Sequence, residues 1–283
     1  MEFDRNVNKE VIALLGAGSM GTAIVRRIAA GRKILLGDIS EAKLAEAQKN
    51  LQYSGYDVET MKVDALDKEN VRDFAKKAAD LGNVMYFIDS AGASPNQADP
   101  QHIMDLDLIA TSYAIDIFGQ VIARGGAGLV IASQTGYMGP NMDDETETIL
   151  ATTPTEKLKD LPQLKPDKID NVGIAYIMSK RVNQLRVRTA AATTWGDRGA
   201  RINTISPGVI VTPLAYDEFA AAGEGYQKMI DASPAKRTGS SDEIAAAGAF
   251  LLGSDAAFIT GTDLLIDGGV IAAMKSGRFQ LGQ

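Results

Sequence analysis

Short apolar runs alternate along the chain with longer segments whose apolar residues recur at helical spacing. Seven runs have the length and the aliphatic content of buried strands: residues 11–15, 33–37, 57–63, 83–88, 128–132, 201–205 and 263–266. Helical patterns fill residues 19–30, 40–51, 68–81 and 173–195. This alternation predicts an α/β fold, a single Rossmann-type, doubly wound parallel sheet with helices on both faces.

Residues 140–171 interrupt this rhythm with a stretch rich in proline and acid. Within it, Thr153-Pro154-Thr155-Glu156 has the form of a capping box with proline at the first helical position. It predicts a short helix to about Leu161, whose apolar side carries Leu158, Leu161 and Leu164. We interpret residues 140–171 as an insertion that is either a solvated excursion or a cover for an active site or interface.

Composition limits the classes of partner. The chain has 283 residues, 45% of them hydrophobic, which suits one domain over residues 1–283 with an elaboration. A net charge of −7 argues against nucleic acid or an anionic membrane. Cysteine is absent, the first ten residues are polar, and no apolar run reaches membrane-span length. We therefore expect a cytoplasmic protein with a small-molecule partner.

His102 is the only histidine, and its neighbours Asp99, Pro100 and Gln101 are typical of a helix start. A Ser-His-Asp triad or a multi-histidine metal site would have to be built around it. We interpret it as a surface residue and expect no metal site.

A glycine pattern, Gly16-Ala17-Gly18-Ser19-Met20-Gly21, follows the first expected strand and opens a helix. This is the context of a dinucleotide-binding loop, in which the glycines allow a tight turn, approach of the pyrophosphate and close helix–strand packing. The helix amino terminus favours the phosphate charge. The pattern predicts cofactor contacts from Gly16, Gly18, Ser19, Met20 and Gly21.

Asp38 ends the second expected strand, seventeen residues beyond Gly21. A carboxylate there can accept both ribose hydroxyls and would repel a 2′-phosphate, which favours NAD over NADP. Asp38 could instead cap the following helix. Ser40 is better placed for that role, which leaves Asp38 for the cofactor.

Tyr176 and Lys180 stand four residues apart in an expected helix, so both side chains leave the same face. A lysine cation beside a phenol should lower the tyrosine pKa toward the range of an acid–base catalyst. Ser133 follows the expected strand at residues 128–132 and is a candidate third group.

Together these motifs resemble those of the short-chain dehydrogenase/reductase family over nearly the whole chain. Asp89-Ser90-Ala91-Gly92 is similar to its Asn-Asn-Ala-Gly segment, Ser133 to its catalytic serine, and Tyr176 and Lys180 to its Tyr-x-x-x-Lys. Val63-Asp64-Ala65 resembles the segment beside the adenine. Further similar segments are Ser206-Pro207-Gly208, Thr212-Pro213, Ile259-Thr260-Gly261 and Ile266-Asp267-Gly268-Gly269.

The resemblance implies hydride transfer between a nicotinamide and a carbonyl or alcohol carbon. Tyr176 would pass the proton, Lys180 would lower its pKa and hold the ribose, and Ser133 would fix the substrate oxygen. Cofactor contacts are implied for Asp64, Ala65, Ser90, Ala91, Gly92, Pro207, Gly208, Ile210 and Thr212, beside Tyr176 and Lys180. A homotetramer is also implied, supported by the apolar run Ile271, Ala272, Ala273 and Met274 near the chain end.

Three features depart from the family pattern. The glycine loop is one residue shorter, and Leu15 stands where threonine is usual. Asp107 takes the place of an asparagine that acts through a backbone kink and a water that reaches the lysine; we keep it among the catalytic residues. Ser133 and Tyr176 are 43 residues apart, a long insertion similar to that of some hydroxysteroid dehydrogenases.

Three functions remain open. The first is an NAD-dependent secondary alcohol dehydrogenase or ketone reductase. Aromatic residues within 214–230 favour an apolar or steroid-like substrate for it, although an ordinary amphipathic helix explains them as well. The second is a nucleotide-sugar epimerase, and the third is a regulator that binds NAD without turnover. Epimerases carry a larger carboxy-terminal domain, and such regulators commonly lose the tyrosine or lysine, both of which are present here.

Overall fold

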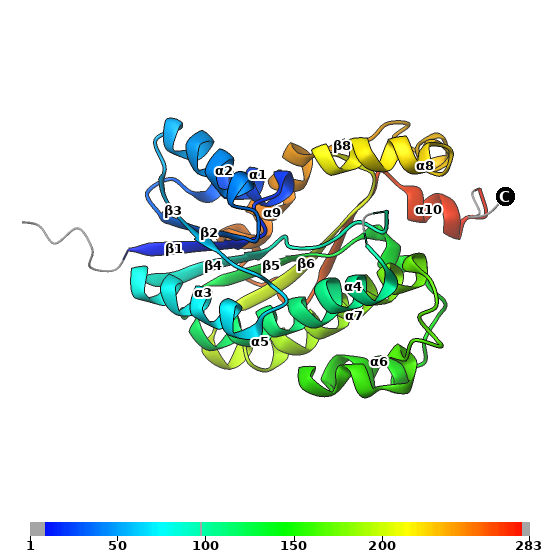
Figure 1. Ribbon diagram of the computed structural model, residues 1–283, viewed down its shortest axis with the longest axis horizontal. Coiled ribbons are helices and arrows are strands. Elements are labelled where there is room, and N and C mark those ends of the chain that lie inside the picture. Colours follow the sequence, from blue (N-terminus) through cyan, green and yellow to red (C-terminus); the bar gives the residue numbers. More distant parts are fainter. Residues whose placement is uncertain (1–8, 97, 279–283) are drawn as a thin grey trace, which may run out of the picture.

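The computed structural model describes residues 9–96 and 98–278, apart from the side chains of residues 214–223. Within this part, parallel strands form one sheet in the order β3-β2-β1-β4-β5-β6-β9 (Figure 1). The strands are β1 (Glu10–Leu15), β2 (Lys33–Asp38), β3 (Asp57–Lys62), β4 (Asn83–Asp89), β5 (Ala127–Ile131), β6 (Arg201–Pro207) and β9 (Asp263–Ile266). All seven expected runs are strands of this sheet, so the predicted fold class is confirmed. A short pair, β7 (Ile210–Val211) and β8 (Gly239–Ser240), stands apart from it.

Helices cover both faces of the sheet, as Figure 1 shows. On one face lie α1 (Ser19–Ile28), α2 (Glu41–Tyr53) and α9 (Ser241–Leu252). On the other lie α3 (Lys68–Leu81), α5 (Thr111–Val121) and α7 (Val172–Ala192). The four helical patterns found in the sequence correspond to α1, α2, α3 and α7, with ends that differ by up to three residues.

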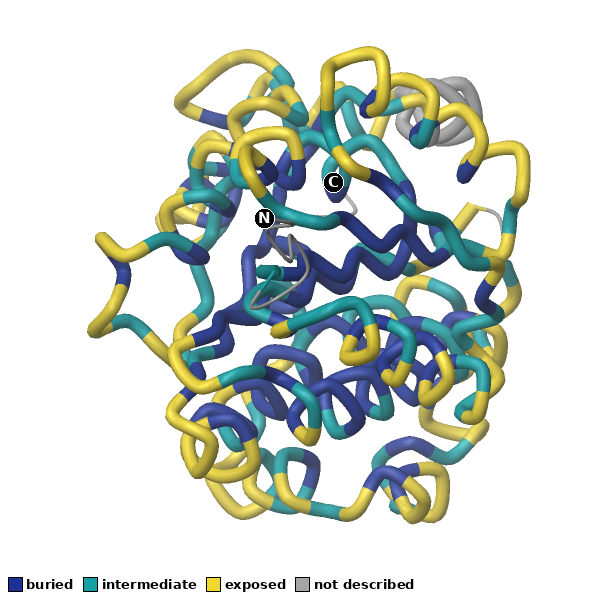
Figure 2. The backbone as a smooth tube through the Cα atoms, turned by 90° about the vertical axis from the view of Figure 1, so that its left-hand side faces the viewer, coloured by how far each residue is buried: buried dark blue, intermediate teal, exposed yellow. Residues whose placement is uncertain are grey.

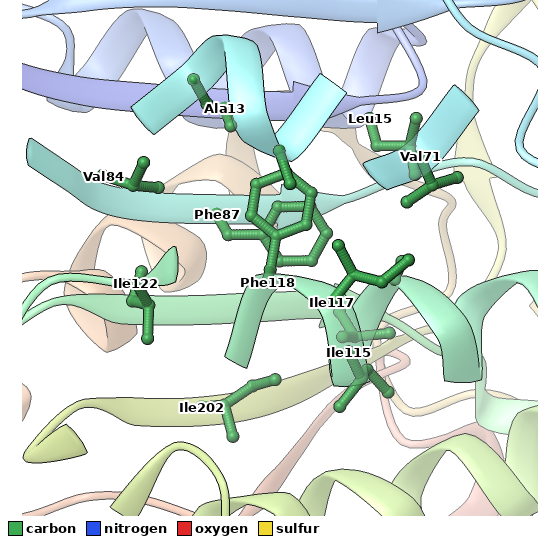
Figure 3. Close-up of a cluster of buried hydrophobic side chains, with 14 of the residues drawn as sticks. Ala13, Leu15, Val71, Val84, Phe87, Ile115, Ile117, Phe118, Ile122 and Ile202 are labelled. Atoms are coloured by element: carbon green, nitrogen blue, oxygen red, sulfur yellow. The ribbon is translucent and has the colours of Figure 1, made fainter. Parts of the chain in front are cut away.

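Two apolar cores form because neighbouring residues of a strand point to opposite faces. In β1, Val11 and Ala13 belong to the core under α3 and α5, whereas Ile12 packs in the core under α1 and α9. Phe87 and Phe118 stack at the centre of the first core, with ring centroids 3.7 Å apart (Figure 3). In Figure 2 the buried strands lie inside a shell of exposed helix surface.

The insertion adds a third apolar cluster. It contains α6 (Asp144–Thr152) and two short 3-10 helices, η3 (Thr155–Asp160) and η4 (Pro162–Leu164). Its buried members Leu150, Leu158 and Leu164 pack against side chains of α7, of α4 (Pro100–Ile103) and of a π-helix, η1 (Met104–Ala110). The apolar side of the insertion therefore covers helices of its own chain.

The expected capping box at Thr153–Glu156 does not form. Thr153 ends α6, η3 begins at Thr155 as a 3-10 helix, and no side chain caps it. The Thr155 hydroxyl instead donates to Asp116 at 2.5 Å and accepts from Arg186 at 2.8 Å. The acidic run lies at the amino terminus of α6, where the Asp143 side chain caps the helix by accepting from Thr146 N. Negative charges at this end of a helix interact favourably with the helix dipole.

The only histidine, His102, lies exposed on α4, whose cap is Asp99, as predicted.

Helix α10 (Val270–Lys275) near the chain end packs within the chain, because its residues Ile271 and Ala273 are each only 3% exposed. The apolar run at residues 271–274, which we expected to need a partner subunit to shield it from solvent, therefore has two of its residues covered by its own chain, while Ala272 is exposed. In the described part of the chain, no helix combines the length and apolar character that crossing a membrane requires.

Candidate active site

The glycine loop between β1 and α1 has the geometry of a pyrophosphate cradle. Gly16 adopts φ +87°, and a Cβ on it would lie 2.4 Å from Ala91 N. A Cβ on Gly21 would lie 2.7 Å from Leu14 Cδ1, so this glycine lets α1 pack closely on β1. Gly18 faces open space, with nothing within 4 Å of such a Cβ. No side chain caps α1, which leaves the first-turn N–H groups near Ser19 and Met20 for an anion.

Asp38, at the end of β2, is tied into this loop. Its Oδ2 accepts from Ala17 N and its Oδ1 from Ser40 N, both at 2.8 Å. The Ser40 hydroxyl accepts from Lys43 N, which confirms Ser40 as the cap of α2. The sequence suggested that Asp38 is free of other contacts, but its carboxylate already accepts two backbone hydrogen bonds. Each carboxylate oxygen still has a second lone pair that can accept from a ribose hydroxyl.

The other expected cofactor residues lie at the same edge of the sheet, because parallel strands end together. Val63 N donates to Asp38 O at 3.0 Å, which places Asp64 and Ala65 beside the end of β2. Ser90 N donates to Leu15 O at 2.8 Å, which brings Ser90, Ala91 and Gly92 beside the glycine loop. The residues present therefore fit an extended dinucleotide.

The segment after β6 reaches this edge as well. Gly208 N donates to Ile266 O at 2.9 Å, and a Cβ on Gly208 would lie 2.6 Å from Asp267 Cα. After Pro207 and Gly208 the chain continues through Ile210, which is 8% exposed, to the half-buried Thr212. Helix α8 (Pro213–Ala232) follows. The side chains of Tyr216 and Phe219, which we linked to substrate, lie outside the described residues.

Tyr176 and Lys180 share one face of α7, as their spacing predicts. The Lys180 ammonium lies 5.1 Å from the centroid of the half-buried Tyr176 ring, and Lys180 itself is 5% exposed. The Asn171 side chain caps α7 by accepting from Ile174 N at 2.9 Å, so the helix begins one turn before the tyrosine.

Ser133 leaves β5 beside α7. Its hydroxyl accepts from Thr135 N at 3.2 Å and starts the 3-10 helix η2 (Gln134–Tyr137). This helix packs directly on α7, since a Cβ on Gly136 would lie 2.8 Å from Gln184 Nε2. Gln184 stands one turn beyond Lys180. The structure thus brings the Ser133 segment to the helix that carries Tyr176 and Lys180.

Asp107 joins the same group. It lies in the π-helix η1, the kind of local distortion often found at functional sites. Its side chain is fully buried, with Oδ1 accepting from Ala93 N at 2.9 Å and Oδ2 3.6 Å from Lys180 Nζ. Its backbone carbonyl accepts from Asn183 Nδ2 at 2.7 Å. The aspartate found at the family's asparagine position is therefore a direct partner of the lysine.

Asp89, which the sequence analysis named only as the start of the Asp89-Ser90-Ala91-Gly92 segment and gave no role, is a second buried acid near the lysine. It ends β4, is 2% exposed and accepts from Ala91 N at 3.1 Å. Burial raises the pKa of Asp89 to about 7, against the opposing influence of the Ala91 N–H and Lys180. A charged residue at the end of an otherwise apolar strand was the signal that could have identified it.

The two acids hold the lysine charged. Burial on its own would lower the pKa of Lys180, but Asp107, Tyr176 and Asp89 together hold it above its ordinary value. Burial likewise raises the pKa of Asp107 against the pull of Lys180. Gly92 permits this packing, because a Cβ there would lie 2.8 Å from Asp107 Oδ1 and 3.5 Å from Lys180 Nζ.

A second phenol near Ser133 is already engaged. Tyr137 donates to Asp263 Oδ2 at 2.6 Å, and burial, followed by this hydrogen bond, raises its pKa. Tyr137 therefore stays neutral and bound to Asp263, which leaves Tyr176 as the better proton carrier.

The chain is similar to known proteins over most of its length. A family model described as short chain dehydrogenase matches residues 10–136, and one described as enoyl-(acyl carrier protein) reductase matches residues 167–271. A short-chain dehydrogenase/reductase of Alternaria brassicicola is 39% identical, over 95% of this chain and 98% of its own length. A D-threitol dehydrogenase of Mycolicibacterium smegmatis is 28% identical over 95% of both chains.

Among solved structures, a short-chain dehydrogenase/reductase from Serratia marcescens superposes with a TM-score of 0.73 at 21% identity. The match covers 94% of this chain and 99% of that one, and it supports the fold. The extent of the Alternaria match, with both family models, shows that the chain belongs to the short-chain dehydrogenase/reductase family of oxidoreductases.

Proposed function

We propose that this oxidoreductase is NAD-dependent and interconverts a secondary alcohol and a ketone at Ser133, Tyr176 and Lys180. One observation carries the proposal above all: the buried Lys180 ammonium lies 5.1 Å from the Tyr176 ring centroid on one helix face. The family's substrates, which are alcohols and carbonyl compounds, and its nicotinamide cofactor supply the reaction class.

Each residue has a distinct task in this proposal. A bound nicotinamide supplies the hydride acceptor or donor. Tyr176 gives its phenolic proton to the substrate oxygen during reduction and takes it back during oxidation. Ser133, held at the end of β5, donates a hydrogen bond to that oxygen. Lys180 provides the positive charge beside the phenol and a donor for the ribose.

The proposed preference for NAD rests on Asp38. Its carboxylate lies beside the glycine loop, where it accepts from two backbone N–H groups, those of Ala17 and Ser40. The negative charge of this carboxylate would repel the 2′-phosphate of NADP. Asp64 and Ala65 would flank the adenine, Ser90 to Gly92 the adjoining ribose, and Ile210 and Thr212 the carboxamide. These roles follow the family resemblance and the shared edge of the sheet.

For the substrate, we propose an apolar, steroid-like alcohol or ketone. Gln134, which follows Ser133 in the chain, donates from its Nε2 to Met229 Sδ of helix α8 at 3.7 Å. Figure 1 shows α8 beyond the ends of β5 and β6. The substrate side of the site is thus bordered by a helix with an apolar component. The D-threitol dehydrogenase among the relatives makes a polyol the contrasting choice. A homotetramer, from the resemblance, and a single catalytic domain and a cytoplasmic location, from length and composition, complete the proposal.

A cofactor-reduction assay tests the proposal. The protein is incubated with NAD and, in parallel, with NADP, and offered hydroxysteroids, aliphatic secondary alcohols and polyols while reduced nicotinamide is followed by absorbance. We expect turnover with NAD and at least one secondary alcohol. An epimerase would convert a nucleotide sugar without net reduction, and a regulator would bind NAD without turnover; either result would replace the proposed function.

A further inference from the structure

We propose that the negative charges of Asp89 and Asp107 offset the positive charge of Lys180 and so keep Tyr176 in its neutral, proton-donating form at neutral pH. This adapts the site to carbonyl reduction. This inference rests on the proposed function, because it assigns a direction to the same site. It concerns two positions where the resembling family carries neutral asparagines and this chain carries acids.

The geometry gives the lysine three potential anionic neighbours. Asp107 Oδ2 lies 3.6 Å from Lys180 Nζ, with the acid fully buried and the lysine side chain 6% exposed. The Tyr176 ring approaches the same ammonium from one turn earlier on α7. Asp89, buried at the end of β4, interacts electrostatically with both Lys180 and Asp107.

The surroundings supply little other charge. The groups that act on Asp89 are the Ala91 N–H, Lys180, Asp107 and the Thr111 hydroxyl of α5. Those that act on Asp107 are Lys180, the Ala93 N–H and, from α4, His102. For Lys180 they are Asp107, Tyr176 and Asp89. Thus one strong cation lies among two buried carboxyl groups and a half-buried phenol.

A phenolate at Tyr176 would add a negative charge to this group. When Asp107 and Asp89 are both ionised, they already outweigh Lys180, so phenolate formation is opposed. Because burial raises the pKa of Asp89 to about 7, Asp89 is neutral below that pH and gains its charge above it. The opposition to the phenolate therefore grows in the range where the phenolate would otherwise form.

The consequence differs for the two directions of the reaction. Reduction needs the phenol as proton donor, and the two acids extend the pH range in which that form exists. Oxidation needs the phenolate as proton acceptor, so it requires more alkaline conditions. Asp89 and Asp107 act through Lys180, so they are positioning residues whose effect appears in a pH profile.

The test uses Asp107→Asn and Asp89→Asn, singly and together, because asparagine keeps the shape and removes the charge. Tyr176 ionisation is read in the protein without substrate, as the near-ultraviolet tyrosinate absorbance of each variant minus that of its Tyr176→Phe counterpart. The pH profiles of kcat/KM for alcohol oxidation and ketone reduction are recorded in parallel. The control is Asp105→Asn, an acid of the same π-helix that pairs with Lys159 on the outside.

We expect Asp107→Asn to lower the midpoint of Tyr176 ionisation by about one pH unit. Asp89→Asn should lower it by less, and the double variant by more than either. The alkaline fall of reduction and the rise of oxidation should move down in pH with it, while Asp105→Asn matches wild type. Unchanged or upward midpoints in the Asp89 and Asp107 variants would overturn the inference.

Two safeguards keep the outcomes distinct. If Asp107→Asn fails to fold, as circular dichroism would show, Asp89→Asn against wild type decides alone. The absorbance titration needs no turnover, so it reads the charge effect even if no alcohol is oxidised. If the wild-type protein oxidises no alcohol but the midpoints of Tyr176 ionisation shift in the variants, only the proposed function is contradicted. If turnover depends on Tyr176 but the midpoints do not shift, only this inference is contradicted.

Discussion

Asp107 and Lys180 form a buried ion pair, with Oδ2 and Nζ 3.6 Å apart, between the π-helix η1 and the helix that carries Tyr176. Neither partner is open to water, so each compensates the charge of the other. The pair thereby links the position of the lysine to that of η1, which the insertion covers from outside.

Replacing the lysine should leave that acid without its partner. We expect Lys180→Met to lower the free energy of unfolding by about 3–5 kcal/mol, because an uncompensated charge stays buried. Urea unfolding measures the effect, and Lys180→Met with Asp107→Asn should recover part of the loss. In the exposed pair Lys76–Asp80, Lys76→Met should cost less than about 1 kcal/mol. Equal losses at the two lysines would contradict the assignment.

Asp89 should make stability depend on pH. Its pKa is about 7 when folded and near its ordinary value, 3.8, when unfolded, so the folded state binds the proton more tightly. Stability is then lost as pH rises between these values, by up to roughly 4 kcal/mol. Asp89→Asn removes this dependence.

The corresponding experiment compares urea unfolding of Asp89→Asn and wild type across that pH window. The difference should favour the variant increasingly as pH rises. A difference that stays constant with pH would show that Asp89 ionises normally in the folded protein.

Asp38 should govern the choice of cofactor through its charge. Asp38→Asn keeps an acceptor for the Ala17 N–H and removes the repulsion of a 2′-phosphate, so it should raise NADP affinity about tenfold or more with a smaller loss for NAD. Asp38→Ala should also loosen the loop and weaken both cofactors further. Fluorescence titration of the two cofactors measures this, with the nearby Glu41→Ala as control. A wild-type protein that prefers NADP would refute the interpretation of Asp38.

The insertion should contribute mainly to stability. Leu158 is fully buried between the insertion and the helices beneath it, so Leu158→Ala should cost about 2–5 kcal/mol of unfolding free energy. Leu161→Ala, at a partly exposed site in the same segment, should cost clearly less. NAD affinity should stay close to wild type in both. If thermal unfolding of the two variants coincides, the insertion does not pack as described.

The sheet and its cofactor edge could be predicted from the sequence because local patterns determine them. Apolar runs such as residues 83–88 are long enough for strands, and Gly16 and Gly21 each have a position that only a small residue satisfies. Tyr176 and Lys180 follow from helix geometry alone. These features need no knowledge of distant contacts.

The parts that could not be predicted depend on distant partners. Thr153 resembles a helix N-cap, yet it ends α6, and its carbonyl accepts from Arg186, 33 residues later, at 2.8 Å. Asp89 can be recognised in the sequence as an acid at a family asparagine position, but its effect on Lys180 follows only from its burial at the end of β4. Ile271 appeared exposed because the packing of α10 within the chain has no local sequence signal.

The central claim, that Tyr176 passes the proton in an NAD-dependent reaction, is tested most directly by Tyr176→Phe. With the best alcohol from the substrate panel, kcat should fall by about 10²–10⁴-fold, while the NAD dissociation constant stays within severalfold of wild type because Lys180 and the glycine loop are intact. Tyr137→Phe, which removes the phenol bound to Asp263, serves as the matched control and should retain most activity. A Tyr176→Phe protein that turns over at the wild-type rate would contradict the account.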